Sequence, residues 1–180
     1  MTLSRPGDYL PEISHDLDSK LKNLELLALD VDGVLTDCSI FIDDNGRGLK
    51  RFHGLDGHGI KMLSHGGVKI ALISGRECTA TRQRAKELGI TDIHMAIDDK
   101  AAAITNLTRD LGIDLKNTAF AGDDLIDWPA IQLCGISFAP ANAIGFLKDK
   151  VSYVCKAKGG EGAVREICDL VLRAKSLSGY

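Results

Sequence analysis

The chain has 180 residues, of which 44% are hydrophobic and 5% aromatic, and its formal net charge is −3. This length is typical of one globular domain with a sizeable core. The small negative charge excludes a surface built to bind nucleic acid or an anionic membrane. The apolar runs are too short to span a bilayer, and the N-terminus lacks a secretion signal. The five cysteines are scattered without a C-x-x-C pair, which predicts reduced thiols in a cytoplasmic protein.

The first predicted strand is the apolar run 26–29. It follows a polar N-terminal extension, residues 1–25, for which we expect one short helix over residues 14–23. The run is short enough to be a buried strand of a parallel sheet. Asp30 and Asp32 come directly after it. Because residues i and i+2 of an extended chain point the same way, both carboxylates project from the carboxyl end of this strand.

A β-hairpin is predicted within residues 38–53. Its strands Ser39–Ile42 and Leu49–Phe52 flank an Asn-Gly pair, which is a strong hairpin signal. Both faces of this hairpin are apolar, and a two-stranded ribbon cannot bury two faces by itself. We therefore expect the hairpin to pack against another subunit.

Strands and helices alternate along the rest of the chain. In order, we predict helix 56–65, strand 68–74, helix 77–88, strand 93–96, helix 100–111, strand 118–122, a short helix with Pro129 in its first turn, strand 136–139, a helix near 142–147, strand 151–154 and a closing helix after Gly162. This alternation predicts an α/β fold with a doubly wound, mostly parallel sheet flanked by helices. These elements use up the available residues, so we expect residues 26–180 to form a single domain without a cap domain.

Polar residues stand where the predicted strands end. Ser74 ends the second core strand, Asp123 and Asp124 follow the fourth, and Lys100 begins a helix. In a doubly wound sheet these strand ends meet at one crevice, together with the Asp30 pair. We therefore expect these side chains to form a single site.

This set of residues suits the hydrolysis of a phosphomonoester. A carboxylate that approaches a phosphate dianion is repelled, so a hard cation is needed, and Mg²⁺ prefers oxygen ligands. Asp30 and Asp123 can supply carboxylates to the ion and Asp32 its backbone carbonyl. Asp30 is the predicted nucleophile, and Asp32 the general acid and base. Ser74 and Lys100 would bind the transferring oxygens.

Other interpretations of residues 30–37 compete with this one. A plain strand-to-turn connection would carry no function. A calcium loop is excluded because Gly33 comes too early for the EF-hand spacing. A receiver domain of signalling proteins would place its phosphate-accepting aspartate on a later strand.

Four segments, in this order, resemble the motifs of the haloacid dehalogenase superfamily of phosphotransferases. They are DVDGVLTD at 30–37, SGR at 74–76, Lys100, and GDDLID at 122–127. Within that superfamily, nearly everything after residue 25 is similar to the 3-deoxy-D-manno-octulosonate 8-phosphate phosphatase family. This closer similarity is carried by FHGLDGHGI at 52–60, GDDLIDWP at 122–129 and GGEGAVREICD at 159–169.

The resemblance implies a cytoplasmic, Mg²⁺-dependent homotetramer with active sites near its subunit interfaces. It implies hydrolysis of a small anionic sugar phosphate, the 8-phosphate of an eight-carbon sugar acid for lipopolysaccharide, through an aspartyl-phosphate. By position it implies substrate contacts at Asp32, Thr36, His53, Gly54, Leu55, Asp56, Gly57, Lys61, Gly75, Arg76, Arg84, Lys100 and Asp124. Among these, Lys61, Arg76 and Arg84 suit a sugar-acid carboxylate. Cys38 stands where the family more often has glycine.

Residues 157–180 are predicted to form a glycine-rich tail and a helix. Because an uncapped cleft is either open or closed by a neighbour, we expect the tail of one chain to reach an active site in a ring-like oligomer. Removing residues 158–180 should then weaken catalysis without unfolding the core. A flexible linker is the alternative interpretation of these glycines.

Two alternative functions stay open at this point. One is a phosphatase for the 9-phosphate of a nine-carbon acid of the sialic acid or KDN type. The other is a catalytically silent oligomerisation domain of the same fold.

Overall fold

A computed structural model describes residues 10–46 and 48–177 of the chain. Its strands are β1 (Leu26–Leu29), β2 (Phe41–Ile42), β3 (Gly48–Leu49), β4 (Lys69–Ile73), β5 (Asp92–His94), β6 (Thr118–Ala121), β7 (Ile136–Ala139) and β8 (Tyr153–Val154). Its α-helices are α1 (His15–Lys22), α2 (Gly54–His65), α3 (Thr79–Leu88), α4 (Lys100–Leu111), α5 (Trp128–Leu133), α6 (Gly145–Lys148) and α7 (Ala163–Ala174). Two 3₁₀ turns, η1 (Leu115–Asn117) and η2 (Leu125–Asp127), precede β6 and α5. Among the described residues, none of the helices has the length and apolarity needed to cross a membrane.

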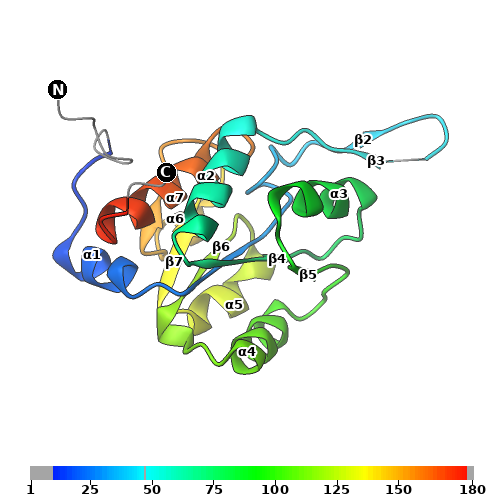
Figure 1. The fold of residues 1–180 in the computed structure, drawn as a ribbon. Coiled ribbons are helices and arrows are strands. Elements are labelled where there is room, and N and C mark those ends of the chain that lie inside the picture. The colour runs from blue at the N-terminus through cyan, green and yellow to red at the C-terminus, as the bar shows by residue number, and fades with distance from the viewer. Residues whose placement is uncertain (1–9, 47, 178–180) are drawn as a thin grey trace.

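The predicted doubly wound parallel sheet is confirmed. Six strands pair in the order β5-β4-β1-β6-β7-β8, and every pair in this sheet is parallel. The chain moves outward from β1 to β4 and β5, then returns to β6 on the other side of β1 and continues to β7 and β8 (Figure 1). The topological switch point therefore lies between β1 and β6, where folds of this class bind their ligands.

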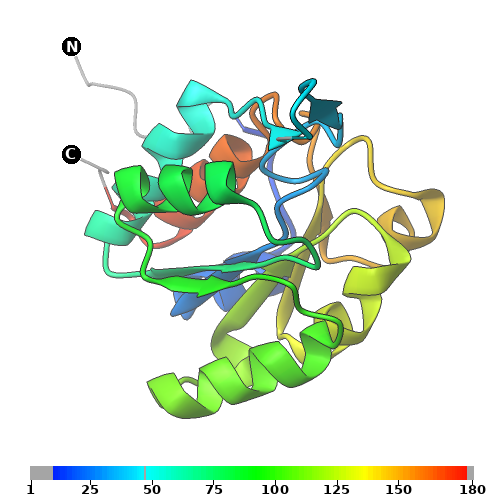
Figure 2. The ribbon, with the colours of Figure 1, turned by 90° about the vertical axis from the view of Figure 1, so that its right-hand side faces the viewer.

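Helices cover both faces of this sheet, as Figure 2 shows. The core on one face includes side chains of α1, α2, α3 and α7, and the core on the other face includes side chains of α4, α5 and α6. Burial on both faces explains why β1 is apolar at every position, with Leu26, Leu27, Ala28 and Leu29 all fully buried. β1 is thus a rigid central element from which the next residues can be positioned.

The predicted hairpin is present, but its strands β2 and β3 are only two residues long. The sequence predicted the longer strands Ser39–Ile42 and Leu49–Phe52. The ladder ends early because the Asp37 carboxylate accepts a hydrogen bond from the Ser39 N–H (3.0 Å) and pairs with Arg51 (2.9 Å). These contacts hold both stems against the loop that follows β1. In Figure 1 the hairpin projects away from the sheet.

The helix ends differ from the prediction by a few residues. α2 begins at Gly54, two residues before the predicted start at residue 56, and His53 is its N-cap. α1, within the predicted N-terminal extension, buries Leu17 and Leu21 in the core. Residues 1–9 of that extension lie outside the described residues.

The C-terminal helix α7 is part of the core. It packs against α2, and its inward side chains are fully buried, namely Val164, Ile167, Leu170 and Val171. The expectation that residues 158–180 could be removed without unfolding the core is therefore wrong. The physical reason is that the amphipathic face of α7 completes one side of the sheet.

The glycine-rich segment before α7 is fixed against the same chain. Gly159 and Gly160 are buried, and the Gly160 N–H donates to the Val34 carbonyl (3.1 Å). A Cβ at Gly159 would lie 1.8 Å from the Gly33 carbonyl oxygen. The segment thus supports the loop after β1 of its own chain, which contradicts the interpretation as a flexible linker.

Candidate active site

Three carboxylates converge at the switch point of the sheet. Asp30 follows β1 and Asp123 follows β6, while Asp127 comes from η2, at the entrance to α5. One oxygen from each lies within 4.8 Å of the others. Asp30 is 4% exposed and Asp127 is fully buried, while Asp123 is half-buried. The structure therefore brings the Asp30 and Asp123 carboxylates together, as the sequence predicted.

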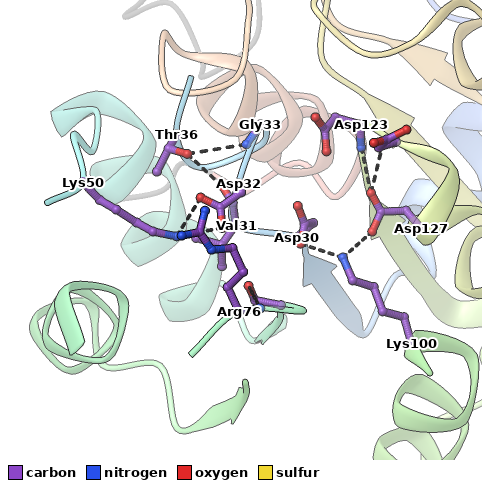
Figure 3. Close-up of polar contacts among 12 residues, drawn as sticks. Asp30, Val31, Asp32, Gly33, Thr36, Lys50, Arg76, Lys100, Asp123 and Asp127 are labelled. Carbon is purple, nitrogen blue, oxygen red and sulfur yellow. Dashed lines mark hydrogen bonds and ion pairs between the residues drawn. The ribbon is translucent and has the colours of Figure 1, made fainter. Parts of the chain in front are cut away.

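Lys100 completes this cluster from the first turn of α4 (Figure 3). Its Nζ lies 2.7 Å from Asp30 Oδ1 and 2.5 Å from Asp127 Oδ1. The second oxygen of Asp127 accepts from the backbone N–H groups of Asp123 and Asp124 (3.0 and 3.3 Å). Lys100 is only 3% exposed. Because its charge is buried, its two carboxylate partners are needed to stabilise it.

The charges of this cluster fit a divalent cation. When ionised, the three carboxylates and one ammonium group leave two negative charges. Burial, followed by repulsion from Asp127, raises the pKa of Asp30 to about 6. Burial, followed by the charges of Asp30, Asp127 and Asp124, raises the pKa of Asp123 to about 7. Oxygen ligands with an excess of negative charge are the donor set that Mg²⁺ prefers, so the residues present fit this ion.

Two glycines allow the acids to approach each other. Gly33 has φ 97°, and a Cβ there would lie 2.0 Å from Asp123 Oδ2. A Cβ at Gly122 would lie 2.4 Å from the Cβ of Asp127. Any larger residue at either position would therefore push an aspartate out of the cluster. This is the physical reason for the Asp-x-Asp-Gly and Gly-Asp-Asp patterns in the sequence.

The loop after β1 is fixed by side chains as well as by the glycine-rich segment. Thr36 is buried, and its hydroxyl donates to the Val31 carbonyl (3.4 Å) and accepts from the Gly33 N–H (3.5 Å). Asn142 donates to the Gly33 carbonyl (3.3 Å) and accepts from the Gly159 N–H (2.7 Å). These bonds hold Asp32 at the rim of the acidic cluster.

Asp32 lies at the rim, beside a cavity between the hairpin and the start of α3. Lys50 Nζ lies 2.7 and 2.8 Å from its two carboxylate oxygens. Arg76 extends toward the same place (Figure 3). The cavity has a volume of about 750 Å³, and Asp32, Lys50, Arg76, Cys78 and the apolar side chains of the hairpin line it. It is large enough for a sugar phosphate and carries cations for an anionic group.

Ser74 stands at the end of β4, as predicted. It is buried at 2% exposure, and its hydroxyl oxygen accepts a hydrogen bond from the Arg76 N–H (3.3 Å). Gly75 lies between these two residues. The sequence Ser-Gly-Arg therefore forms a tight turn that directs the chain from β4 toward the cavity.

The structure does not gather all predicted substrate contacts around this one cavity. Asp56 is buried and accepts from the Arg165 N–H of α7 (2.8 Å). Arg84 pairs with Glu87 (3.2 Å) and packs against Gly57, where a Cβ would lie 2.2 Å from the Arg84 guanidinium.

Other members of that set lie on different surfaces. His53 and Leu55 line a separate hollow with Arg165, and Lys61 lines another near the C-terminal ends of α2 and α3. Gly54 begins α2. Asp124 is exposed and caps η2 through the Leu125 N–H (2.7 Å).

Two residues of the site were missed by sequence reasoning. Asp127 belongs to the motif at 122–127 but received no role, although its spacing of four residues from Asp123 could have indicated a second acid at the same end of β6. Lys50 carries no local sequence signal. Its contact with Asp32 depends on the hairpin folding back over the loop after β1.

The chain is similar to known phosphatases over most of its length. Residues 91–167 match the family of haloacid dehalogenase-like hydrolases. The chain is 42% identical to 3-deoxy-D-manno-octulosonate 8-phosphate phosphatase KdsC of Escherichia coli (strain K12), across 91% of this chain and 87% of the relative. The crystal structure of the phosphatase of that name from Yersinia pestis superposes with a TM-score of 0.89, at 40% identity, covering 91% of this chain and 89% of the other.

A second solved structure contains bound ligands. It is 3-deoxy-D-manno-octulosonate 8-phosphate phosphatase from Moraxella catarrhalis in complex with magnesium ion, phosphate ion and a KDO molecule. Its TM-score is 0.87 at 38% identity, with 89% of this chain and 92% of the other covered. With the acidic cluster, Lys100 and the parallel sheet in place, the chain belongs to the 3-deoxy-D-manno-octulosonate 8-phosphate phosphatase family of haloacid dehalogenase-like hydrolases.

Proposed function

We propose that this protein hydrolyses 3-deoxy-D-manno-octulosonate 8-phosphate to the free sugar acid and phosphate, in the formation of lipopolysaccharide. The observation that carries the proposal is the buried cluster of Asp30, Asp123, Asp127 and Lys100 at the switch point. Relatives at about 40% identity bear the name of this activity. A silent oligomerisation domain would have no need of two buried carboxylates paired with one buried lysine, beside a third carboxylate.

The acidic cluster would hold the Mg²⁺ ion through the side chains of Asp30, Asp123 and Asp127, together with the Asp32 backbone carbonyl. When bound, the ion supplies positive charge that neutralises the phosphate and the acids around it. Lys100 adds a fixed positive charge beside Asp30. This charge stabilises the phosphate oxygens in the transition state.

Asp30 is the nucleophile in this proposal. Its carboxylate oxygen attacks phosphorus and forms an aspartyl-phosphate while the bond to the sugar oxygen breaks. Asp32 gives a proton to the leaving sugar oxygen, then takes one from the water that hydrolyses the aspartyl-phosphate. The Ser74 hydroxyl donates to a phosphate oxygen. The rigid end of β1 supports this division of roles because it holds Asp30 in the cluster and Asp32 at the rim.

The assembly that we propose is a homotetramer in the cytoplasm. The hairpin supports an assembly because its apolar side chains Ile40, Phe41, Ile42 and Leu49 are between 52% and 68% exposed in the single chain. Apolar surface of this kind is typical of a subunit interface. The hairpin also forms one wall of the cavity, so packing against it would bring a neighbouring subunit close to the active site.

A phosphate-release assay tests the activity. With Mg²⁺, the wild-type protein should release phosphate from the eight-carbon 8-phosphate ester, and chelation of the metal should abolish this release. Asp30→Asn should lower kcat by about 1,000-fold or more because the nucleophile is lost. Asp110→Asn, which neutralises an exposed aspartate (69% exposed side chain), is the matched control and should retain wild-type activity.

The same assay separates the substrate alternatives. Faster hydrolysis of a nine-carbon 2-keto-3-deoxy acid 9-phosphate than of the eight-carbon ester would replace the proposed substrate. Undiminished activity in Asp30→Asn would instead remove the nucleophile assignment. Absence of phosphate release from either ester by the wild-type protein would favour the silent domain.

A further inference from the structure

Lys50 lies at the base of the hairpin, directly after β3, and turns inward. Its Nζ contacts both carboxylate oxygens of Asp32, at 2.7 and 2.8 Å. Although lysine side chains are ordinarily exposed, that of Lys50 is only 8% exposed. Burial of a long charged side chain costs free energy unless its charge is paired. The hairpin therefore brings a desolvated positive charge to the proposed general acid and base.

The contact leaves one hydrogen-bond donor of Lys50 available for a ligand. An ammonium group has three N–H donors, and its two contacts with Asp32 use at most two of them. Lys50 also lines the cavity together with Arg76. An anionic group that enters this cavity beside Asp32 would meet two cations on the same side. Without Lys50, the negative charge of Asp32 would repel such an anionic group.

The bond also limits how Asp32 can turn. A carboxylate held by both of its oxygens cannot rotate freely about its final torsion angle, and the loop below it is fixed by Thr36 and Asn142. Catalytic groups work best when their geometry is set before substrate binds. The Lys50 contact supplies this restraint from the side of the hairpin.

We propose that Lys50 has two roles in the reaction, positioning Asp32 and binding the substrate. In the free protein it fixes the Asp32 carboxylate, and in the complex its third N–H donor binds an oxygen of the substrate phosphate. This inference rests on the proposed phosphatase activity. A purely structural alternative is that Lys50 only fastens the hairpin to the body of the protein.

Three variants separate these two possibilities. Lys50→Met keeps the length of the side chain without its charge, Lys50→Arg keeps the charge, and Arg51→Met removes a charge from the adjacent residue. Arg51 is the matched control because its side chain is exposed and pairs with Asp37 and Glu161 (2.9 and 3.6 Å), not with Asp32. For each variant, kcat and KM for the eight-carbon ester, the inhibition constant of inorganic phosphate with Mg²⁺ and the thermal unfolding midpoint are measured.

We expect Lys50→Met to lower kcat/KM by about 10- to 100-fold, the loss typical of a hydrogen bond to a charged group. The inhibition constant of inorganic phosphate should rise at least fivefold. This change is not expected if Lys50 only attaches the hairpin to the body of the protein. Lys50→Arg should recover part of both losses, and Arg51→Met should resemble the wild type.

Two outcomes would overturn the inference. One is a Lys50→Met protein with unchanged phosphate inhibition and kcat/KM. The other is an equal loss in Lys50→Met and Arg51→Met, which would assign the effect to the hairpin as a whole. Failure of the wild-type protein to hydrolyse the ester would instead reject the proposed function, so the two failures are distinguishable.

Discussion

At the scale of single residues, Cys38 has an unusual backbone conformation. Its φ is 68°, in the left-handed region that costs a residue with a Cβ about 1 kcal/mol or more. Glycine adopts this conformation without strain. The glycine that the family resemblance leads us to expect at this position would therefore be unstrained. Cys38 is exposed, so nothing in its burial compensates for the strain.

We therefore predict that Cys38→Gly stabilises the protein. The free energy of unfolding should rise by about 0.5–1 kcal/mol, because relief of strain outweighs the added freedom of the unfolded chain. Denaturant unfolding of the two proteins measures this difference. Cys78→Gly is the control, since Cys78 has φ −153° and loses no strain. A Cys38→Gly protein no more stable than the wild type would contradict the conformational argument.

At the scale of elements, the glycine-rich segment has a supporting role. Gly160 has φ 65°, and a Cβ there would lie 2.6 Å from the Asp37 nitrogen and the Thr36 carbonyl carbon. These are backbone atoms of the loop that holds Asp32. They can move apart only if that loop shifts.

Gly160→Ala should therefore reduce both stability and activity. We expect a loss of roughly 2 kcal/mol from the combined strain and overlap, with a fall in kcat as Asp32 is displaced. Gly67→Ala is a matched control because Gly67 also has positive φ (88°), but a Cβ there would have no packing neighbour within 4 Å. The control should lose about 1 kcal/mol from the strain alone and no activity, and a similar fall in kcat in both variants would contradict the proposed support.

The sequence predicted the central elements of the fold better than its periphery. β1, β4 and β6 are mostly apolar, buried runs with turn residues at both ends. Few structures other than a buried parallel strand fit this pattern. The strands of the hairpin were overestimated because Ser39 and Arg51 bind the Asp37 carboxylate instead of extending the ladder. The sequence predicted the helix α7, but not that its apolar face is essential to the core, because the glycines before it suggested a separate tail.

At the scale of the whole molecule, the exposed hairpin leads to a prediction about assembly. Light scattering should give the mass of a tetramer for the wild-type protein. Ile42→Asp, at a side chain that is 68% exposed in the single chain, should reduce that mass by placing a charge in the interface. Leu133→Asp, at an exposed apolar residue on α5 (42%), should leave it unchanged. A wild-type monomer would contradict the proposed assembly.

The sequence predicted those site residues that lie at the ends of parallel strands. Asp30, Ser74 and Asp123 end parallel strands, so the sheet topology alone brings them together. Asp127 and Lys50 could not be placed in this way. The position of Asp127 depends on the turn from η2 into α5, and that of Lys50 depends on the base of the hairpin lying against the loop after β1. In both cases the backbone position of the residue is set by tertiary packing and not by the order of the strands.

The central position of β1 has a consequence for how the protein is made. Leu26 pairs with Lys69 on one side and Thr118 on the other. The strand that precedes the nucleophile Asp30 can therefore complete its sheet pairs only after both of these later segments have been synthesised. Closing such long loops is slow because chain entropy is lost before contacts form. On the ribosome, β1 can pair with β4 first, but its other edge must stay unpaired until β6 emerges. Enzymatic activity should therefore be among the last properties that a newly made chain acquires.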